Sequence, residues 1–530
     1  MTWTHAPNAP EHDVLIIGTG FAGLGAAIQL GKAGFHNLVL IEKEPDLGGT
    51  WFVNTYPGCA CDIESHMYSF SFEPNPGWSR DFAPQSEILA YMRRVADKYR
   101  LRDKTRFGSQ VVSLRYDEQH CFWRVEIAEA ERVRAFMEQH GLKPGDALPR
   151  EAADFPATTT LTARIVVAGM GGLSTPAYPA LPGLSRFRGK TFHSQRWDHD
   201  YDLTGKRVAV IGTGASAIQF VPAIQPHVAQ LDVYQRTPPW IFPKGDRPIS
   251  AARRRLFGLV PPLRLLRRLE LYLKLELRAV AFVLRPQLLE HVARRALRYL
   301  ESEVADPVLR EKLTPSYAVG CKRVLLTDDW YAALQKANVE LVTDGIAEVR
   351  EHAIVDAAGV ERPVDCMIYG TGFRIADVVP RGLVFGRGGR DVTTIWQRGP
   401  EAYRGTTVSG CPNFFIMAGP NTGLGHNSII YMIESQLRYL VDALRWMKRE
   451  NVGEIEVKAG AQTKFNAGIS DRSRGTVWES GGCASYYLDP VTGRNFTIWP
   501  DFTFRFRALM RHFDPEHYAR RAASGPVFGR

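Results

Sequence analysis

Cysteine is scarce in this chain, with seven residues in 530, and the seven are scattered. Cys59 and Cys61 form a C-x-C pair with no second pair nearby, which argues against a zinc site, and the C-x₄-C spacing of flavin disulfide reductases is absent. An odd and scattered set predicts reduced thiols in a cytoplasmic protein. We expect no bound metal.

We expect neither a targeting segment nor a membrane-spanning one. Residues 1–7 show no basic stretch followed by an apolar one, and no apolar run approaches the roughly 20 residues that cross a bilayer. A hydrophobic content of 45% is ordinary for a soluble protein. A cytoplasmic chain of two or three domains is therefore expected.

Two glycine-rich turns, about two hundred residues apart, each follow an apolar run. The first is Gly18-Thr19-Gly20-Phe21-Ala22-Gly23 and the second is Gly212-Thr213-Gly214-Ala215-Ser216-Ala217. The first glycine of such a turn permits the tight bend, the second lets the backbone approach a pyrophosphate, and the third small residue lets helix pack on strand. Both turns predict dinucleotide sites, with phosphates at a helix N-terminus.

The residue that ends the next strand distinguishes the two sites. Glu42 stands 24 residues after Gly18, and a carboxylate there accepts hydrogen bonds from ribose hydroxyls and repels a 2′-phosphate. Arg236, followed by Thr237, stands 24 residues after Gly212 and offers several donors to a phosphate. The first turn is therefore predicted to bind FAD and the second NADPH.

These elements predict an α/β fold with two dinucleotide-binding, Rossmann-like domains, one for FAD and one for NADP. We expect the first part of the FAD domain at 1–180, the NADP domain at 181–369 with a helical insertion at about 245–315, and the second part of the FAD domain, with a C-terminal loop region, at 370–530.

Acidic residues are too few to balance the basic ones, and the net charge is +10. Between residues 253 and 298 there are twelve Lys and Arg against three Glu, so the excess is local, which argues against a nucleic-acid surface. The apolar residues of this stretch recur at helical spacing, and prolines break it into at least three helices: Leu266, Leu269, Leu273, Leu277, Val280 and Leu284, with Pro261, Pro262 and Pro286 as the breaks.

Two interpretations of this basic stretch stay open. The first is a helical insertion whose apolar side packs on the NADP domain and whose basic side is solvated. The alternative is a surface that contacts anionic lipid, which would make about 253–298 a peripheral membrane contact, or that lines the route of an apolar substrate.

The link between the two predicted domains resembles a family fingerprint. Residues 187–198 match F-x-G-x-x-x-H-x-x-x-W-[P/D] at every fixed position, namely Phe187, Gly189, His193, Trp197 and Asp198. A second signature, [AG]-G-x-W-x-x-x-x-[FY]-P-[GM]-x-x-x-D, is matched by residues 48–62, ending at Asp62. The chain thus resembles the flavin-dependent Baeyer–Villiger monooxygenases of the type I, single-component, NADPH-using class. The related N- and S-oxygenating flavin monooxygenases usually have Tyr or Phe where Trp197 stands.

The resemblance implies residue roles. Lys322 would contact the 2′-phosphate, Arg323 would stabilise the peroxide formed on C4a of the flavin, and Asp62 would pair with Arg323 and orient it. A fixed cation suits an anionic peroxide and the oxyanion that follows, because Arg does not deprotonate. Other positions matching family contacts to the flavin are Gly49, Thr50, Trp51 and Tyr68.

The remaining matched residues are interpreted structurally. His193 and Trp197 are expected to couple cofactor binding to domain position, with general-base chemistry as the alternative, and Asp198 to brace the segment that follows. One position departs from the family: Ser485-Tyr486 stands where Ser-Trp is common in a loop over NADPH, and Trp478 or Trp499 would then supply the missing bulk.

The resemblance implies a monooxygenase that uses FAD, NADPH and O₂ to convert a small-molecule ketone to an ester or lactone, with sulfoxidation as a side activity. The first alternative is an N- or S-oxygenating flavin-containing monooxygenase. The second is a membrane- or partner-binding protein whose nucleotide sites only sense redox state.

Overall fold

The computed structural model describes residues 9–377, 379–396, 399–489, 491–523, 525 and 527–528. Its largest sheet has eight strands in the order β17-β4-β5-β6-β1-β2-β3, with β18 also paired to β6. The strands of this first sheet are β1 (His12–Ile17), β2 (Leu38–Ile41), β3 (Thr105–Arg106), β4 (Ser109–Asp117), β5 (Phe122–Glu129), β6 (Thr158–Ala168), β17 (Val384–Phe385) and β18 (Phe414–Ile416).

A second sheet has five strands in the order β12-β9-β8-β16-β7, and all its pairs are parallel. Its strands are β7 (Lys190–His193), β8 (Arg207–Ile211), β9 (Gln230–Tyr234), β12 (Val339–Val342) and β16 (Cys366–Tyr369). The three smaller sheets are β10 (Ile241–Phe242) with β11 (Leu325–Leu326), β13 (Ile346–Val349) with β14 (Ala353–Asp356) and β15 (Glu361–Pro363), and β19 (Val452–Val457) with β20 (Tyr518–Ala522).

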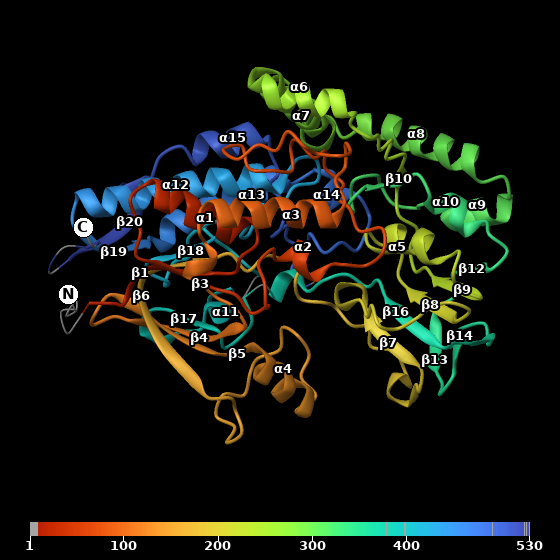
Figure 1. Ribbon diagram of the computed structural model, residues 1–530, viewed down its shortest axis with the longest axis horizontal. Coiled ribbons are helices and arrows are strands. Elements are labelled where there is room, and N and C mark those ends of the chain that lie inside the picture. The colour runs from red at the N-terminus through yellow and green to blue at the C-terminus, as the bar shows by residue number, and fades with distance from the viewer. Residues whose placement is uncertain are drawn as a thin grey trace.

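Helices cover the sheets, and the longest of them, α12, runs beside α1 above the first sheet (Figure 1). The helices outside the insertion are α1 (Phe21–Lys32), α2 (Thr50–Val53), α3 (Gln85–Lys98), α4 (Ala130–Gln139), α5 (Ala217–Ile224), α10 (Trp330–Leu334), α11 (Val392–Ile395), α12 (Ile429–Arg449), α13 (Ala459–Ser473), α14 (Val477–Ser480) and α15 (Thr503–Leu509). The predicted α/β fold with two Rossmann-like units is confirmed: the second sheet is wholly parallel, and the first is parallel around β1 but has antiparallel pairs between β4, β5 and β6.

The predicted helical insertion follows β10 and stands above the rest of the molecule in Figure 1. It comprises α6 (Ala251–Leu259), α7 (Pro261–Ala279), a π-helical turn (Val280–Leu284), α8 (Leu288–Glu303) and α9 (Pro307–Leu313). The breaks fall beside Pro261 and Pro286, as the sequence indicates. In the part of the chain that the structure describes, no helix is both long and apolar enough to cross a membrane.

The apolar side of the insertion does not pack as expected. Leu266, Leu269, Leu273 and Leu277 are each more than half exposed, so the expectation that this apolar side packs on the NADP domain was wrong. The helix instead buries Leu271, Leu275 and Ala279. Periodicity identifies an apolar stripe on a helix but not the direction in which the fold turns that stripe.

The polar contacts of α7 go to segments 64–69 and 427–504, which adjoin the first sheet, whereas α8 packs near Trp240 and Tyr331 beside the second sheet. The insertion therefore spans both units rather than covering the NADP unit alone.

A disulfide corrects the expectation of seven reduced thiols. Cys321 and Cys483 are bonded, with Cα atoms 6.2 Å apart, although 162 residues separate them in the chain. Sequence spacing cannot reveal such a pair, because only the tertiary fold brings the two segments together. The free cysteines are Cys59, Cys61, Cys121, Cys366 and Cys411.

Candidate functional site

The first glycine turn lies where β1 ends, between its parallel neighbours β2 and β6. Gly18 has φ +89°, and a Cβ there would meet the Gly169 carbonyl oxygen at 2.6 Å, so only glycine fits. A Cβ on Gly23 would lie 1.8 Å from the Gly18 oxygen, so the helix can pack this closely only because residue 23 is glycine. By contrast, a Cβ on Gly20 would meet nothing nearer than the Gly49 Cα at 3.8 Å, so the turn is open on that side.

Glu42 closes this turn from the end of β2. Its buried carboxylate accepts hydrogen bonds from the Thr19 N–H (2.8 Å) and hydroxyl (2.7 Å) and, through its other oxygen, from the Glu44 N–H (3.0 Å). Because a carboxylate has about four acceptor positions, capacity remains for further donors. The side chain thus holds the glycine turn and also presents negative charge at its mouth.

The second turn repeats this geometry at the end of β8. Gly212 has φ +105° and approaches the Gly370 carbonyl, where a Cβ would lie at 2.6 Å, whereas a Cβ on Gly214 would find no atom nearer than 3.9 Å. Ser216 precedes α5, which begins at Ala217. Both turns therefore combine one crowded glycine with one that leaves space above a helix N-terminus.

Two cations lie near this second turn. Arg236 follows β9 and is exposed, and Thr237 beside it is partly buried. Burial and the charge of Arg236 together lower the pKa of Lys322 below its ordinary value of 10.5. Two positive groups held close enough to repel each other form a site that an anion would stabilise.

Arg323 and Asp62 form an ion pair between segments that are 261 residues apart. The Arg323 Nη2 lies 2.6 Å and its Nε 2.7 Å from the same oxygen, Oδ2 of Asp62. About a third of each side chain is exposed, and the pKa of Arg323 is raised chiefly by the charge of Asp62. The guanidinium is therefore permanently charged and fixed in direction.

The other predicted flavin contacts lie close to Asp62 in sequence. The Trp51 indole N–H donates to the Tyr68 hydroxyl at 3.2 Å, and the two rings meet edge to face at 5.5 Å. Gly49 and Thr50 begin the short helix α2, and Gly49 faces Gly20 across the first turn. The structure thus brings these four residues together beside the first turn.

The link fingerprint lies at the edge of the second sheet. His193 ends β7 opposite Tyr369 and is fully buried, and its Nδ1 accepts the Gln195 N–H at 3.1 Å. Burial lowers the pKa of His193 to about 4. Gly189 is required by crowding, because a Cβ would lie 2.5 Å from the Asp365 oxygen and equally close to the Phe187 ring.

Trp197 and Asp198 serve the packing of the link. The Trp197 ring packs against Phe192 and against Phe220 of α5, with ring centroids 5.1 and 5.3 Å apart. Asp198 forms an ion pair with Lys190 and accepts the Asp200 N–H at 3.0 Å, so it braces the following turn.

Gln219 of α5 makes contacts that no sequence pattern predicts. Its side chain accepts from the Tyr56 hydroxyl (3.1 Å) and the Ala60 N–H (3.3 Å) and donates to the Ala60 oxygen (3.1 Å). Gly58 makes this approach possible, since a Cβ there would lie 2.6 Å from the Gln219 carbonyl oxygen. The segment that leads to Asp62 is therefore fixed to the helix of the second turn.

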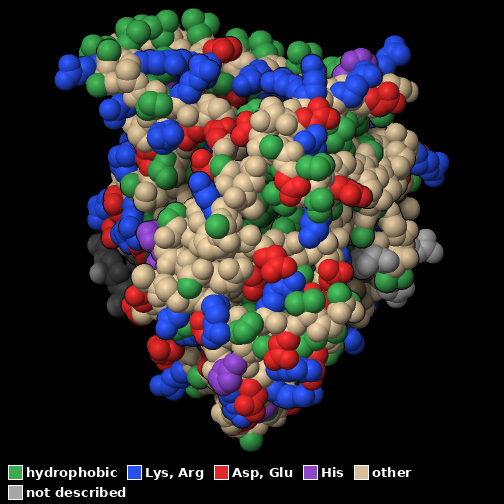
Figure 2. All heavy atoms as spheres, turned by 90° about the vertical axis from the view of Figure 1, so that its right-hand side faces the viewer, with side chains coloured by type: hydrophobic (Ala, Val, Ile, Leu, Met, Phe, Trp, Pro, Cys, Tyr) green, Lys and Arg blue, Asp and Glu red, His purple; other side chains and the backbone are tan. Residues whose placement is uncertain are grey.

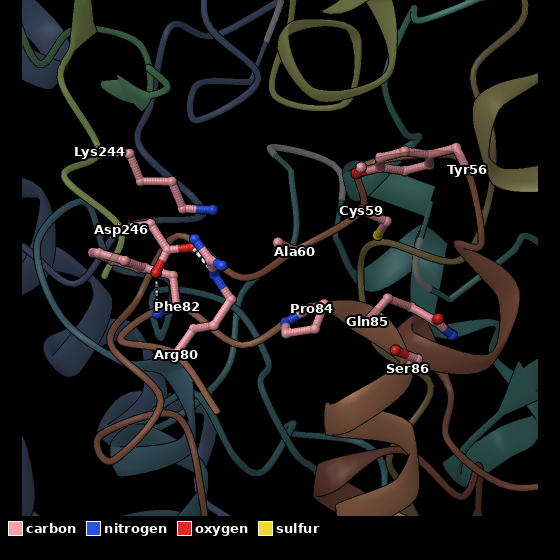
Figure 3. A pocket seen from close by; sticks show the side chains of 11 residues that line it. Tyr56, Cys59, Ala60, Arg80, Phe82, Pro84, Gln85, Ser86, Lys244 and Asp246 are labelled. Atoms are coloured by element: carbon pink, nitrogen blue, oxygen red, sulfur yellow. Dashed lines mark hydrogen bonds and ion pairs between the residues drawn. The ribbon is translucent and has the colours of Figure 1, made fainter. Parts of the chain in front are cut away.

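A cavity of about 390 Å³ borders the same segment. Figure 3 shows Lys244, Asp246 and Arg80 at one end and Tyr56 and Cys59 at the other. Arg80 and Asp246 are paired at 2.7 Å. Burial raises the pKa of the Cys59 thiol to about 12, so this cysteine is not a nucleophile.

The C-terminal loop corrects one expectation. Trp478 and Trp499 are both buried in the core, so neither supplies bulk over a coenzyme. Tyr486 is exposed, and its neighbour Tyr487 is buried close enough to Arg323 to help raise the pKa of that guanidinium. Cys483 ties this loop to Cys321, next to Lys322 and Arg323.

Comparison with known proteins agrees with this geometry. The model of an NAD(P)-binding Rossmann-like domain matches residues 16–83, and that of the flavin-binding monooxygenase-like family matches residues 156–249. A Baeyer–Villiger monooxygenase of Pseudomonas aeruginosa is 51% identical over 98% of this chain and 93% of its own length. A Baeyer–Villiger monooxygenase of Streptomyces coelicolor is 45% identical over 95% of this chain and 92% of its own length.

A solved structure extends the likeness to cofactors. The chain is similar to OTEMO in complex with FAD and NADP, with a TM-score of 0.80 and 25% identity, over 97% of this chain and all of that one. The relatives bear the Baeyer–Villiger name, so the N- or S-oxygenating alternative is not favoured. The chain therefore belongs to the Baeyer–Villiger monooxygenase family of oxidoreductases.

Proposed function

We propose that this chain binds FAD and NADPH and uses O₂ to convert a ketone to an ester or lactone. The observation that carries the proposal is the Arg323–Asp62 ion pair, which fixes a permanent cation between the two glycine-turn units. One oxygen atom enters the carbon–carbon bond beside the carbonyl, and the other leaves as water while NADPH becomes NADP⁺. Sulfoxidation is a side activity of the same site.

The first turn fits FAD. The open side at Gly20 leaves room for a pyrophosphate at the N-terminus of α1, and Glu42 offers acceptors for ribose hydroxyls. Gly18 and Gly23 keep strand and helix close, and Gly49, Thr50, Trp51 and Tyr68 border the turn. These residues would hold FAD, which when bound would supply the hydride acceptor and the chemistry that activates O₂.

The second turn fits NADPH. Gly212, Gly214, Ser216 and Ala217 form the phosphate turn, and Arg236, Thr237 and Lys322 provide donors for the 2′-phosphate. The mutual repulsion of Arg236 and Lys322 is relieved when an anion lies between them, so the site favours NADPH over NADH.

Arg323 stabilises negative charge that develops on oxygen during the transfer to the ketone. Asp62 keeps the guanidinium protonated and directs it, and a fixed donor of this kind acts without reorganisation at the moment of reaction. His193 is neutral at physiological pH because its pKa is about 4, which favours a structural role over proton transfer. Phe187, Gly189, Trp197 and Asp198 hold the same link.

The domain division follows from these sites. We infer that residues 1–180 and 370–530 together hold FAD and that 181–369 hold NADP, with the insertion at about 245–315 spanning both. The bonds from Gln219 to Tyr56 and Ala60 then couple the coenzyme unit to the flavin unit.

The decisive experiment is product analysis with NADPH, O₂ and panels of ketones and amines. We expect esters or lactones from ketones, whereas N-oxides without esters would contradict the proposal. Arg323→Ala should retain FAD and lower kcat for ester formation about 10²- to 10³-fold. The matched control is Arg207→Ala. Arg207 begins β8, at the end of the strand away from the second glycine turn, so its replacement should leave kcat unchanged.

A further inference from the structure

A continuous row of leucines on the insertion faces outward. Leu259 ends α6 and is 82% exposed. Leu266, Leu273 and Leu277 are 59%, 57% and 69% exposed, and they recur at intervals of seven and four residues along one side of α7. Figure 2 shows apolar side chains along the upper rim of the molecule, where α6 and α7 lie. Isolated exposed leucines are ordinary, but a row of this length marks an interaction surface.

Polar side chains of α7 that bond to the rest of the protein fix this orientation. Buried Glu276 accepts hydrogen bonds from the Thr503 N–H (2.6 Å), the Thr503 hydroxyl (2.6 Å) and the Asn427 amide (2.9 Å). Arg268 donates to the carbonyl oxygens of His66 (2.8 Å) and Ser69 (3.0 Å). Rotating α7 to bury the leucines would leave these charged groups unpaired, so the fold holds the leucine row outward.

The same surface extends beyond α7. Leu284 follows in the π-helical turn, Leu288 begins α8, and both are about half exposed. Phe504, whose backbone N–H approaches Glu276, is 49% exposed beside α7 and adds an aromatic ring from α15. We call this set, together with the leucines of α6 and α7, the leucine rim.

Basic side chains border the leucine rim. Twelve Lys and Arg lie between residues 253 and 298, and in the described part of the chain only Arg267 and Lys274 of these form ion pairs. The acid within the rim, Glu270, is paired with Arg267 at 2.8 Å. Figure 2 shows the resulting row of Lys and Arg directly beneath the apolar rim.

We propose that the leucine rim docks on the surface of a bilayer that contains anionic lipid, with α7 lying in the plane of the interface. Apolar side chains that enter the headgroup–acyl boundary, flanked by cations at the level of the phosphates, are what an interfacial helix requires. The charge distribution favours this partner over a second copy of the chain, because two basic borders would face each other and repel.

The test is flotation of the full-length holoenzyme with vesicles of phosphatidylcholine alone and with about one-third phosphatidylglycerol. We expect binding to the anionic vesicles that weakens with salt. Leu266→Ser/Leu273→Ser/Leu277→Ser should lower the partition coefficient at least about tenfold. Arg278→Gln/Arg285→Gln should lower it roughly twentyfold or more at low salt, at about fivefold per charge.

The control is Val308→Ser/Val360→Ser, which removes two exposed apolar side chains outside the rim and should bind as the wild type does. Because the replaced leucines are exposed, we expect each variant to keep the wild-type melting temperature and FAD content. These two measurements verify that the variant is folded. Absence of flotation, flotation that the leucine variant retains, or a leucine-dependent dimer in ultracentrifugation would each overturn the proposal. None of these outcomes depends on the oxygenation reaction.

Discussion

We propose that the coenzyme preference depends on Arg236 and Lys322, whose charges are coupled, and replacing Arg236 separates their contributions. On the proposed assignment, Arg236→Ala removes a charge-assisted hydrogen bond to the 2′-phosphate, a group that NADH lacks. Such bonds contribute about 1.5–3 kcal/mol, and the exposure of Arg236 places it at about 1.5–2 kcal/mol because solvent screens the charge. We therefore expect KM for NADPH to rise about 10- to 30-fold and KM for NADH to change little.

The same substitution should alter the pH profile of NADPH binding. The proposed contact of Lys322 with the 2′-phosphate requires the protonated amine, and the pKa of Lys322 lies below 10.5 because of burial and the charge of Arg236. As the pH rises through that pKa, Lys322 becomes neutral and KM for NADPH increases. Without Arg236 one cause of the lowered pKa is gone, so the alkaline rise should move to higher pH.

The assay is steady-state oxidation of NADPH and of NADH between pH 7 and 10, with quantified ester as the readout of coupled turnover. Arg207→Ala provides the control, since Arg207 pairs with Asp365 at the far end of β8. Equal effects of Arg236→Ala on both coenzymes would refute the 2′-phosphate contact. An unshifted alkaline limb would show that Lys322 is not coupled to Arg236.

Three further predictions concern stability and cofactor retention. Gly20→Ala should abolish FAD loading and leave the melting temperature of the apoprotein unchanged. Gly23→Ala should lower that melting temperature, because only the Cβ at position 23 collides with the protein itself. Equal melting temperatures of the two variants would contradict this. Thiol titration of the denatured, unreduced chain should count five free thiols, and seven would exclude the Cys321–Cys483 bond. For His193, the unfolded chain takes up a proton between pH 6.5 and 4 and the folded chain does not, so the free energy of unfolding falls by up to about 3 kcal/mol as pH drops through that window. Burial lowers the pKa values of His66 and His426 to about 4 as well, so His193→Asn should make the urea midpoint fall less steeply between these pH values without abolishing the fall. An unchanged slope would disprove the lowered pKa of His193.

Local patterns predicted the nucleotide units well. The bend at Gly18, the close packing at Gly23 and the acid at Glu42 all lie within one strand–helix–strand unit, so spacing along the chain determines their geometry. The same holds for Gly212 and the cation at Arg236. Sequence alone suffices wherever the contacts of a site are short-range.

Long-range contacts were out of reach. The Gln219 bonds to Tyr56 and Ala60 cross about 160 residues, and nothing in the residue types marks them. The outward leucines were mispredicted for the same reason, since the partners of Glu276 that fix α7 lie more than 150 residues away. The Arg323–Asp62 pair was anticipated only through the family resemblance.

The strand order of the first sheet has a consequence for how the chain acquires its structure during synthesis. All five strands of the second sheet lie between residues 190 and 369, whereas β17 and β18 of the first sheet pair with β4 and β6 across about 250 residues or more. The second sheet can therefore form while the ribosome still holds β18, and the first sheet is completed last, at the entropic cost of its long-range pairings. Pulse-labelled hydrogen exchange during refolding should accordingly protect β8 and β16 before β18.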